Sequence, residues 1–240
     1  MAEDQQTIHG RKACQALFKQ RPEAIRRIFY RREGAQELGD MLRWAAARKL
    51  VYREVSDDEL AKLAKTNHHE GLVLVTNPMR FRRMNYLEAG QSGLWLGLDR
   101  VENPHNLGAI LRTAAFFGLN GVVVGGVSEG EKVNGAAIRV AQGGAEHLAI
   151  CAEPDLPSLL HNLVSEGWQV MGLETGGESL ATVLPATRPW MLVAGHEAYG
   201  LGLETRQACG QLVTIPGAGA VGSLNVSVAV GVALGLLVGS

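Results

Sequence analysis

The sequence predicts an α/β protein built on a largely parallel sheet with helices on both faces. From Gly93 onward, short apolar segments that fit buried strands alternate with segments that fit helices, which is the pattern of repeated strand-helix-strand units. The strand candidates end in glycine-rich or polar turns, where ligands usually bind in such sheets. These candidates are 94–98, 121–124, 148–151, 168–173, 190–194 and 212–215.

A smaller α/β domain is expected over residues 1–76. Apolar residues at helical spacing alternate there with short apolar stretches, and Ser56 and Glu59 form a capping-box signature before a further helix. Residues 77–92 lack apolar periodicity, so we expect a linker before a second domain, 93–240. The elements expected in the first domain are helices over 13–18, 38–45 and 57–64 and strands near 25–30, 50–55 and 71–76.

The composition indicates a globular chain with a substantial core, since 46% of its 240 residues are hydrophobic. Cys14, Cys151 and Cys209 stand apart in the sequence and form no paired metal or redox motif, and three such cysteines suit a reducing cytoplasm. The polar stretch 1–6 does not resemble a secretory signal. We therefore expect a cytoplasmic protein.

Charge divides the chain into two parts. The formal net charge is −1, but residues 1–90 carry +5 and residues 91–240 carry −6. A basic first part suggests a polyanionic partner, and an ordinary solvated surface explains the same excess equally well.

Two nucleotide-binding motifs and a metal site are disfavoured. Gly125 and Gly130 have the spacing of a phosphate loop, but Lys132 comes one place late and Val133 replaces the Ser or Thr that would hold magnesium. No G-x-G-x-x-G turn follows the first strand of the sheet. Only His68 and His69 lie close together among the histidines, and adjacent side chains rarely chelate one ion, so we expect no metal.

The stretch 215–230 combines a strand end, a glycine-rich turn, a polar pair and an apolar helix. Its glycines allow backbone N–H groups to approach a small molecule closely, although an ordinary loop before a core helix has the same composition. The apolar run 226–238 falls short of the about 20 residues that span a bilayer, so we expect a buried helix and no membrane span.

Two further clusters follow predicted strands. Asn106 and Arg112 lie near and within a probable helix, and six residues advance a helix by about 600°, so they share a face only if Asn106 precedes it. We therefore expect Asn106 at or before the helix cap. The other cluster places one carboxylate, Glu197, between Gly195 and Gly200.

Together the three clusters resemble the SpoU (TrmH-like) family of the SPOUT superfamily, which are RNA 2′-O-ribose methyltransferases. The family motifs N-x-G-x-x-x-R-T/S-A, G-x-E-x-x-G and I-P-x-x-G-x-x-x-S-L-N-V-S-V-A match 106–114, 195–200 and 215–229, in the family's order. Residues 139–147 resemble the intervening S-x-G-A-x-E-H segment. Segments 8–17 and 67–73 resemble the small ribosomal-protein-like RNA-binding domain that precedes many catalytic domains of this family.

The resemblance implies a SPOUT-type, mostly parallel sheet with a C-terminal trefoil knot, preceded by a small α/β RNA-binding domain. It implies S-adenosylmethionine as the cofactor, held at positions that match Gly195, Gly200, Ile215 and Leu224. It also implies a homodimer that needs no metal and methylates a ribose 2′-hydroxyl of tRNA or rRNA. Gly231 and Gly235 fit close helix packing, either between subunits or within one chain.

The catalytic positions implied are Asn106, Arg112, Glu197, Ser223 and Asn225. Arg112 matches the family arginine proposed to activate the hydroxyl. Because a guanidinium stays protonated near neutral pH, we prefer a role in binding the substrate phosphate or stabilising the developing alkoxide. Asn106 and Glu197 would orient Arg112 and the loops, and Ser223 and Asn225 would hold the substrate or the turn.

Gly217, Gly222 and Gln142 depart from residues common in the family, which concerns substrate choice more than activity. The alternative function is a non-catalytic RNA-binding or ribosome-assembly protein on the same scaffold, and a methyltransferase with a non-RNA substrate comes third. The basic residues considered for phosphate contacts are Arg11, Lys12, Arg26, Arg27, Arg80, Arg82 and Arg83, for each of which a solvated surface role is an equal alternative.

Overall fold

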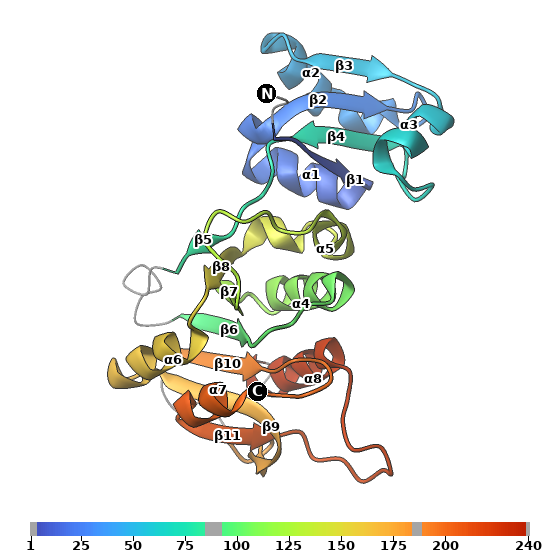
Figure 1. Cartoon of the computed structure of the whole chain (residues 1–240). Coiled ribbons are helices and arrows are strands. Elements are labelled where there is room, and N and C mark those ends of the chain that lie inside the picture. Colours follow the sequence, from blue (N-terminus) through green and yellow to red (C-terminus); the bar gives the residue numbers. More distant parts are fainter. Residues whose placement is uncertain (1–3, 85–92, 184–188, 239–240) are drawn as a thin grey trace. The chain divides into compact units, whose positions relative to one another are not determined.

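The computed structural model describes residues 4–84, 93–183 and 189–238 (Figure 1). The chain divides into two compact units, the first made of Met1–Met79 with Lys132–His147 and the second of Arg80–Glu131 with Leu148–Ser240. The sequence-based boundaries place residues 132–147 in the second domain, whereas this segment folds with the first unit. Whether residues 1–76 form a domain of their own stays a prediction.

The first unit is a four-stranded sheet with helices packed beside it (Figure 1). Strand β4 pairs antiparallel with β1 and β2, and β3 pairs parallel with β2 at the edge. The alternation of helices and strands expected from the sequence is present. Its elements are β1 Gln6–His9, α1 Arg11–Gln20, η1 Pro22–Ala24, β2 Ile25–Tyr30, η2 Ala35–Leu38, α2 Gly39–Ala47, β3 Val51–Glu54, α3 Asp57–Ala64, β4 Leu72–Thr76, α5 Gly135–Val140 and η3 Gly144–His147.

Helix α3 begins as the sequence predicts. Ser56 Oγ accepts the backbone N–H of Glu59 at 3.3 Å, and Glu59 Oε2 accepts the backbone N–H of Ser56 at 3.3 Å. Both halves of the capping box therefore form, which satisfies two N–H groups that the first helical turn leaves unpaired. The helix then places Leu60 in a buried cluster with Phe29 and Val73.

The second unit is built on a seven-stranded sheet in the order β11-β9-β10-β6-β7-β8-β5. Every pairing among its described strands is parallel. All six strands predicted from the sequence are present, and 94–98 and 190–194 have the predicted bounds. The strands are β5 Arg82–Arg83, β6 Leu94–Leu98, β7 Gly121–Gly125, β8 Ala149–Glu153, β9 Gln169–Ser179, β10 Trp190–Ala194 and β11 Gln211–Thr214.

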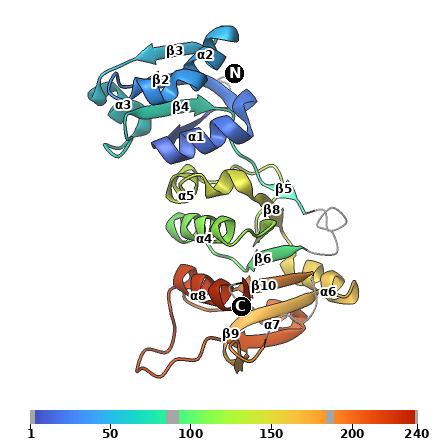
Figure 2. The same ribbon diagram turned by 180° about the vertical axis from the view of Figure 1, so that it is seen from behind.

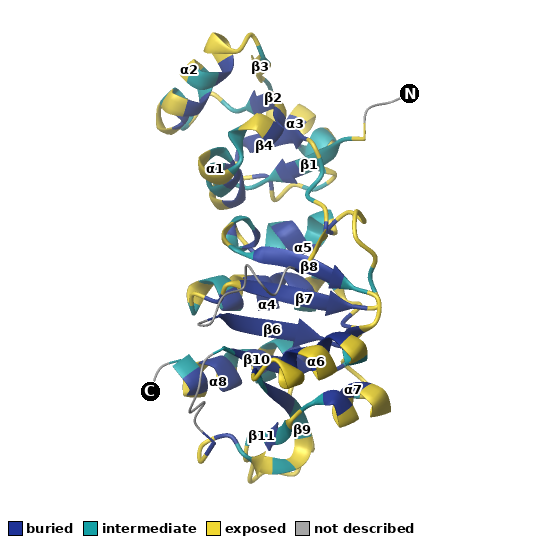
Figure 3. Ribbon diagram, turned by 90° about the vertical axis from the view of Figure 1, so that its left-hand side faces the viewer, coloured by how far each residue is buried: buried dark blue, intermediate teal, exposed yellow. Residues whose placement is uncertain are grey.

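Helices cover both faces of this sheet, as predicted. On one face α6 (Leu156–Ser165) packs with α7 (Leu203–Ala208), and on the other α4 (Pro104–Phe116) packs with α8 (Val226–Val238), as Figures 1 and 2 show from opposite sides. Successive strand residues point to opposite faces, so alternate side chains such as those of Trp95, Val123 and Val193 join the leucines of α6 in one core. Strands β6, β7 and β10 are buried along their whole length, which Figure 3 shows in dark blue.

The expected linker contains more structure than the sequence predicts. Residues 82–83 form β5, which pairs with β8 at the edge of the sheet, and the flanking Phe81 and Met84 are buried. A two-residue strand is too short to show apolar periodicity, so its pattern could not be recognised. Residues 85–92, the rest of the expected linker, lie outside the described residues.

The C-terminal helix α8 is less buried than expected. Val230 and Leu234 are fully buried, but Val228, Val232 and Leu236 are 50%, 40% and 37% exposed and recur every four residues along one side of the helix. Helix α8 therefore has a buried and an exposed apolar side, although its sequence is apolar all round. Among the described helices, none is both long and apolar enough to cross a membrane.

Candidate active site

The turn after β10 forms the first part of the candidate site. His196 and Gly200 close it with two backbone hydrogen bonds of 2.9 Å each. A Cβ atom added to Gly195 would lie 2.1 Å from the carbonyl carbon of Gly200 and 2.3 Å from the nitrogen of Leu201. Gly200 itself has a φ of 68°, in the left-handed region. Glycine at both ends therefore makes this tight turn possible, and the turn carries Glu197.

Glu197 links the three predicted motif segments through hydrogen bonds. Its Oε1 accepts the side-chain N–H of Asn106 at 2.9 Å and the backbone N–H of Asn103 at 3.2 Å. Asn106 Oδ1 accepts the side-chain N–H of Asn225 at 3.1 Å. Asn225 Oδ1 accepts the backbone N–H of Ser227 at 2.9 Å, which fixes the first turn of α8. One carboxylate and two amides thus join segments that lie 91 and 119 residues apart in the chain.

Asn106 lies inside helix α4, which corrects the expectation that it stands at or before the helix cap. Asn103 is the N-cap, and its Oδ1 accepts the backbone N–H of His105 at 2.8 Å. Pro104 follows at the first helical position, where a missing N–H costs nothing. The expectation failed because it assumed that Asn106 must share a helix face with Arg112, whereas Asn106 turns toward Glu197.

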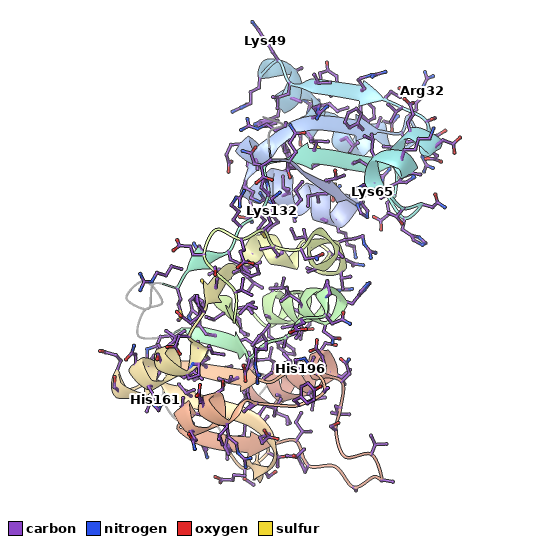
Figure 4. All side chains as sticks on the ribbon, viewed as in Figure 1. Arg32, Lys49, Lys65, Lys132, His161 and His196 are labelled. Atoms are coloured by element: carbon purple, nitrogen blue, oxygen red, sulfur yellow. The ribbon has the colours of Figure 1, made fainter. Side chains whose placement is uncertain are left out.

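The Glu197 carboxylate is held in its ionised form. Burial opposes ionisation, but the hydrogen bonds from Asn106 and Asn103 and the nearby imidazole of His196 outweigh it, so the pKa of Glu197 lies below its ordinary value. His196, labelled in Figure 4, places its Nδ1 4.0 Å from Glu197 Oε2, and this Nδ1 also accepts the N–H of Ala198 at 3.0 Å. A fixed negative charge in the turn therefore orients the surrounding amide donors.

The other predicted catalytic and cofactor positions remain outside this hydrogen-bond network. Arg112 is exposed on α4, and among the described residues it has no hydrogen-bond or ion-pair partner. Ser223 is exposed in the connection between β11 and α8, and so is Leu224, whereas Ile215 at the end of β11 is half-buried. The guanidinium of Arg112 is therefore available to a ligand.

At two positions where this sequence differs from residues common in the family, Gly217 and Gly222, the surrounding structure does not require glycine. Added Cβ atoms on Gly217 and Gly222 would meet no atom within 4 Å, and neither residue has a φ in the left-handed region. Gln142, by contrast, has a φ of 48°, where serine carries a similar backbone strain. Gly231 and Gly235 face Thr113 and Phe117 of the same chain, which favours the packing role within one chain.

Two residues of the site were missed by the sequence analysis. Asp99 is buried directly after β6, and its Oδ2 accepts the N–H of Gly202 at 2.6 Å, which anchors the far end of the Glu197 turn. Asn103 caps α4 and also donates its backbone N–H to Glu197. Both stand between the predicted strand 94–98 and Asn106, and the Asn103-Pro104 pair is a helix-start signal that could have revealed the cap.

The basic residues considered for RNA contacts differ in their surroundings. Arg11 pairs with Glu37 at 2.5 Å and donates to the Glu70 and Glu33 carbonyl oxygens, so it is committed to the first unit. Arg26 donates to Asn77 Oδ1, and Arg27 donates to Gln5 Oε1. Arg80 donates to the carbonyl oxygen of Gly130. Lys12, Arg82 and Arg83 have exposed side chains and are better placed for a phosphate.

Two family models match the chain. The model described as the SpoU rRNA methylase family matches residues 93–235, which is more than half of the chain. The model described as RNA 2′-O ribose methyltransferase substrate binding matches residues 7–82.

Relatives and solved structures agree with these matches. A protein of Escherichia coli O157:H7, named an uncharacterized tRNA/rRNA methyltransferase, is 38% identical over 232 residues, which are 95% of this chain and 66% of the relative. This chain therefore spans slightly less than two thirds of that relative's length. Two crystal structures share the fold at 21% identity. One is the SpoU methyltransferase AviRb from Streptomyces viridochromogenes with AdoMet, which has a TM-score of 0.79 and covers 97% of this chain and 89% of its own. The other is an AdoMet-bound rRNA methyltransferase from Sinorhizobium meliloti, which has a TM-score of 0.78 and covers 97% of this chain and 86% of its own.

Proposed function

Since this chain belongs to the SpoU rRNA methylase family, we propose that it transfers a methyl group from S-adenosylmethionine to a ribose 2′-hydroxyl of tRNA or rRNA. The observation that carries the proposal is the hydrogen-bond network of Glu197, Asn106 and Asn225, which joins the three motif segments in one place. The match of residues 7–82 to a 2′-O ribose substrate-binding model supports the ribose hydroxyl as the acceptor.

The glycine turns fit S-adenosylmethionine. Added Cβ atoms on Gly217, Gly219 and Gly222 would meet no protein atom within 4 Å, so the main chain of this connection is open to a ligand, whereas the Gly195 turn is closely packed and leaves no room for a side chain. Gly195, Gly200, Ile215 and Leu224 would hold the cofactor, which supplies an electrophilic methyl group when bound. In the described part of the chain, no cluster of three His, Cys, Asp or Glu side chains could hold a metal ion.

Arg112 would act on the acceptor RNA. Its guanidinium is exposed and has no partner among the described residues, so it can bind the phosphate next to the reacting ribose or the oxygen that loses its proton. A protonated guanidinium is a poor base, which favours this electrostatic role over proton abstraction. The Glu197 network would keep α4, and hence Arg112, in register with the Gly195 turn, while Ser223 and Asn225 would fix the connection that leads into α8.

The first unit would bind the RNA substrate. It carries most of the positive charge of the chain, and Lys12 offers an exposed side chain on it, while the second unit adds the exposed side chains of Arg82 and Arg83. These contacts position the RNA through its phosphates and do not identify its sequence.

We also propose the C-terminal trefoil knot and the homodimer. The shared fold with AviRb supports a SPOUT-type arrangement of the chain, and the knot would form where residues after β11 return to the sheet. The exposed apolar stripe of Val228, Val232 and Leu236 on α8 supports a dimer, because water contact with such a stripe is unfavourable.

A charge placed on this stripe is expected to produce a monomer. Val232→Asp puts a carboxylate in the centre of the apolar surface, which an interface would have to desolvate without a partner. Sedimentation velocity at micromolar concentration should show the parent as a dimer and the variant as a monomer. Val164→Asp, at a 38% exposed valine of α6 on the other face of the sheet, is the matched control and should remain dimeric. A monomeric parent would refute the dimer.

Methyl transfer in vitro tests the main proposal. The full-length chain is incubated with S-adenosylmethionine carrying a tritiated methyl group and with total tRNA or rRNA, and 2′-O-methyl positions are mapped at nucleotide resolution. We expect label at ribose hydroxyls of a few positions. Binding of RNA and S-adenosylmethionine without transfer would favour a non-catalytic ribosome-assembly role, and transfer only to non-RNA acceptors would favour the third alternative.

A further inference from the structure

The connection between β7 and β8 leaves the unit to which both strands belong. Strand β7 ends at Gly125 and β8 begins at Ala149, and the two are hydrogen-bonded neighbours in the second unit. The segment Lys132–His147 between them belongs to the first unit. We call it the crossover segment. The chain therefore passes between the units after residues 79, 131 and 147, three times instead of once.

Apolar packing attaches the crossover segment to the first unit. Helix α5 packs on β1, and η3 packs on α1, while Ile138, Ala141 and Ala145 of the segment are almost fully buried. At Gly143 the contact with α1 is too close for a side chain, since an added Cβ atom would lie 2.7 Å from Ala16 Cβ and 3.1 Å from the carbonyl oxygen of Lys12. The segment thus packs closely against helix α1.

Polar contacts at the start of the crossover segment restrict this packing to one geometry. Gln6 Nε2 donates to the carbonyl oxygen of Val133 at 2.8 Å, and Gln6 Oε1 accepts the N–H of Met79 at 2.9 Å. Lys132, labelled in Figure 4, forms an ion pair with Asp4. Gln6 of β1 therefore holds the chain beside two of the three points at which it passes between the units, after residues 79 and 131.

The main polar contact at the other end of the crossover segment is a bidentate ion pair between Arg21 and Glu146. Arg21 Nε lies 2.6 Å from Glu146 Oε2 and Arg21 Nη2 lies 3.0 Å from Oε1. The side chains are 19% and 2% exposed, so both charges are largely removed from water and each depends on the other. A planar guanidinium facing a carboxylate in this way fixes direction as well as distance. Such a pair specifies position more than it adds net stability.

We propose that Arg21 and Glu146 are positioning residues that lock the crossover segment onto the RNA-binding unit, so that RNA held by the first unit is presented to the methyl-transfer site of the second. The part of this inference that concerns RNA rests on the proposed function. The structural part does not, since it concerns only the attachment of residues 132–147.

Hydrogen exchange of the full-length protein tests the attachment. Glu146→Gln and Arg21→Gln each break the pair and leave an unmatched buried group, so amides of residues 132–147 should exchange at least about tenfold faster, while those of β6 and β10 keep the parent rate. The double variant should show no larger effect than either single one, because all three remove the same interaction. Asp40→Asn, in the exposed Arg43–Asp40 pair of the same unit, is the matched control and should change nothing. Unchanged exchange in 132–147, or additive effects, would overturn the proposal.

Steady-state methylation tests the link to RNA. In Glu146→Gln the KM for RNA should rise about fivefold or more, while kcat at saturating RNA and the Kd for S-adenosylmethionine stay within twofold of the parent. Faster exchange with an unchanged KM would refute the presentation of RNA. If Glu146→Gln does not fold, Arg21→Lys is tested in its place. This variant keeps the positive charge but loses the planar guanidinium that makes two parallel hydrogen bonds, so it should give smaller changes in the same direction. A parent protein without methyl transfer would contradict the proposed function, and the exchange experiment would still decide the attachment.

Discussion

Arg112→Ala is expected to lower the rate of methyl transfer to RNA by about 10²–10³-fold, which is the typical loss when one group that stabilises transition-state charge is removed. The affinity for S-adenosylmethionine should remain within twofold of the parent, because the proposed cofactor positions lie on other segments. The physical basis is the exposed guanidinium on α4, which forms no hydrogen bond or ion pair with the described residues. Single-turnover rates with saturating RNA, together with calorimetric cofactor binding, measure both quantities.

Two further variants sharpen this result. Arg112→Lys keeps a positive charge but loses the planar guanidinium with its paired N–H donors. A phosphate-binding or alkoxide-stabilising role therefore predicts partial activity, between that of the alanine variant and the parent. Arg206→Ala, at an exposed arginine of α7 in the same unit, is the control for loss of a surface charge and should leave the rate unchanged. An alanine variant with normal cofactor binding and an undiminished rate would remove Arg112 from the mechanism.

The sheet of the second unit was predictable because its strands are buried on both faces. Strands β6 and β10 are short, almost continuous apolar runs bounded by turn residues, which is the pattern typical of a strand that is buried on both faces. The capping box before α3 was equally local, since Ser56 and Glu59 bond to each other's backbone. Patterns with a purely local cause could therefore be recognised from the sequence.

Features that depend on distant partners could not be recognised in this way. The side-chain direction of Asn106 is set by Glu197, which lies 91 residues later in the chain. Neither local sequence indicates that these two side chains meet. The burial of Glu146 depends on Arg21, 125 residues earlier. The exposed side of α8 was also hidden, since a helix that is apolar all round is predicted to be buried, whether its cover is the same chain or another. Motif resemblance predicted the candidate site residues, and the coordinates show which of them are in contact.

Gly195→Ala is expected to cost more stability than any other single added methyl group in the candidate site. The new Cβ atom would lie 2.1 Å from the carbonyl carbon of Gly200, 2.3 Å from the nitrogen of Leu201 and 2.4 Å from the carbonyl oxygen of Gly200. All three are backbone atoms, so no side-chain rotation can relieve the clash and the turn must open. Overpacking of this kind costs about 1–3 kcal/mol or more, and an opened turn would also displace Glu197 from Asn106.

Unfolding and ligand binding together measure this effect. Each kcal/mol corresponds to about 2–4 °C in Tm for a chain of this size, so the Tm of the second unit should fall by several degrees. The transition is measured by the fluorescence of Trp95, Trp168 and Trp190, which all lie in that unit. The affinity for S-adenosylmethionine should fall by at least about tenfold, because the proposed cofactor turn no longer has its closed shape. Gly210→Ala is the matched control: its Cβ atom would meet Val170 O at an ordinary 3.6 Å, and its φ is not in the left-handed region. Such a substitution changes stability by less than about 1 kcal/mol. A Gly195→Ala protein with the Tm and the cofactor affinity of the Gly210→Ala protein would show that the turn is open in solution, and the proposed cofactor site at the Gly195 turn would then have no structural basis.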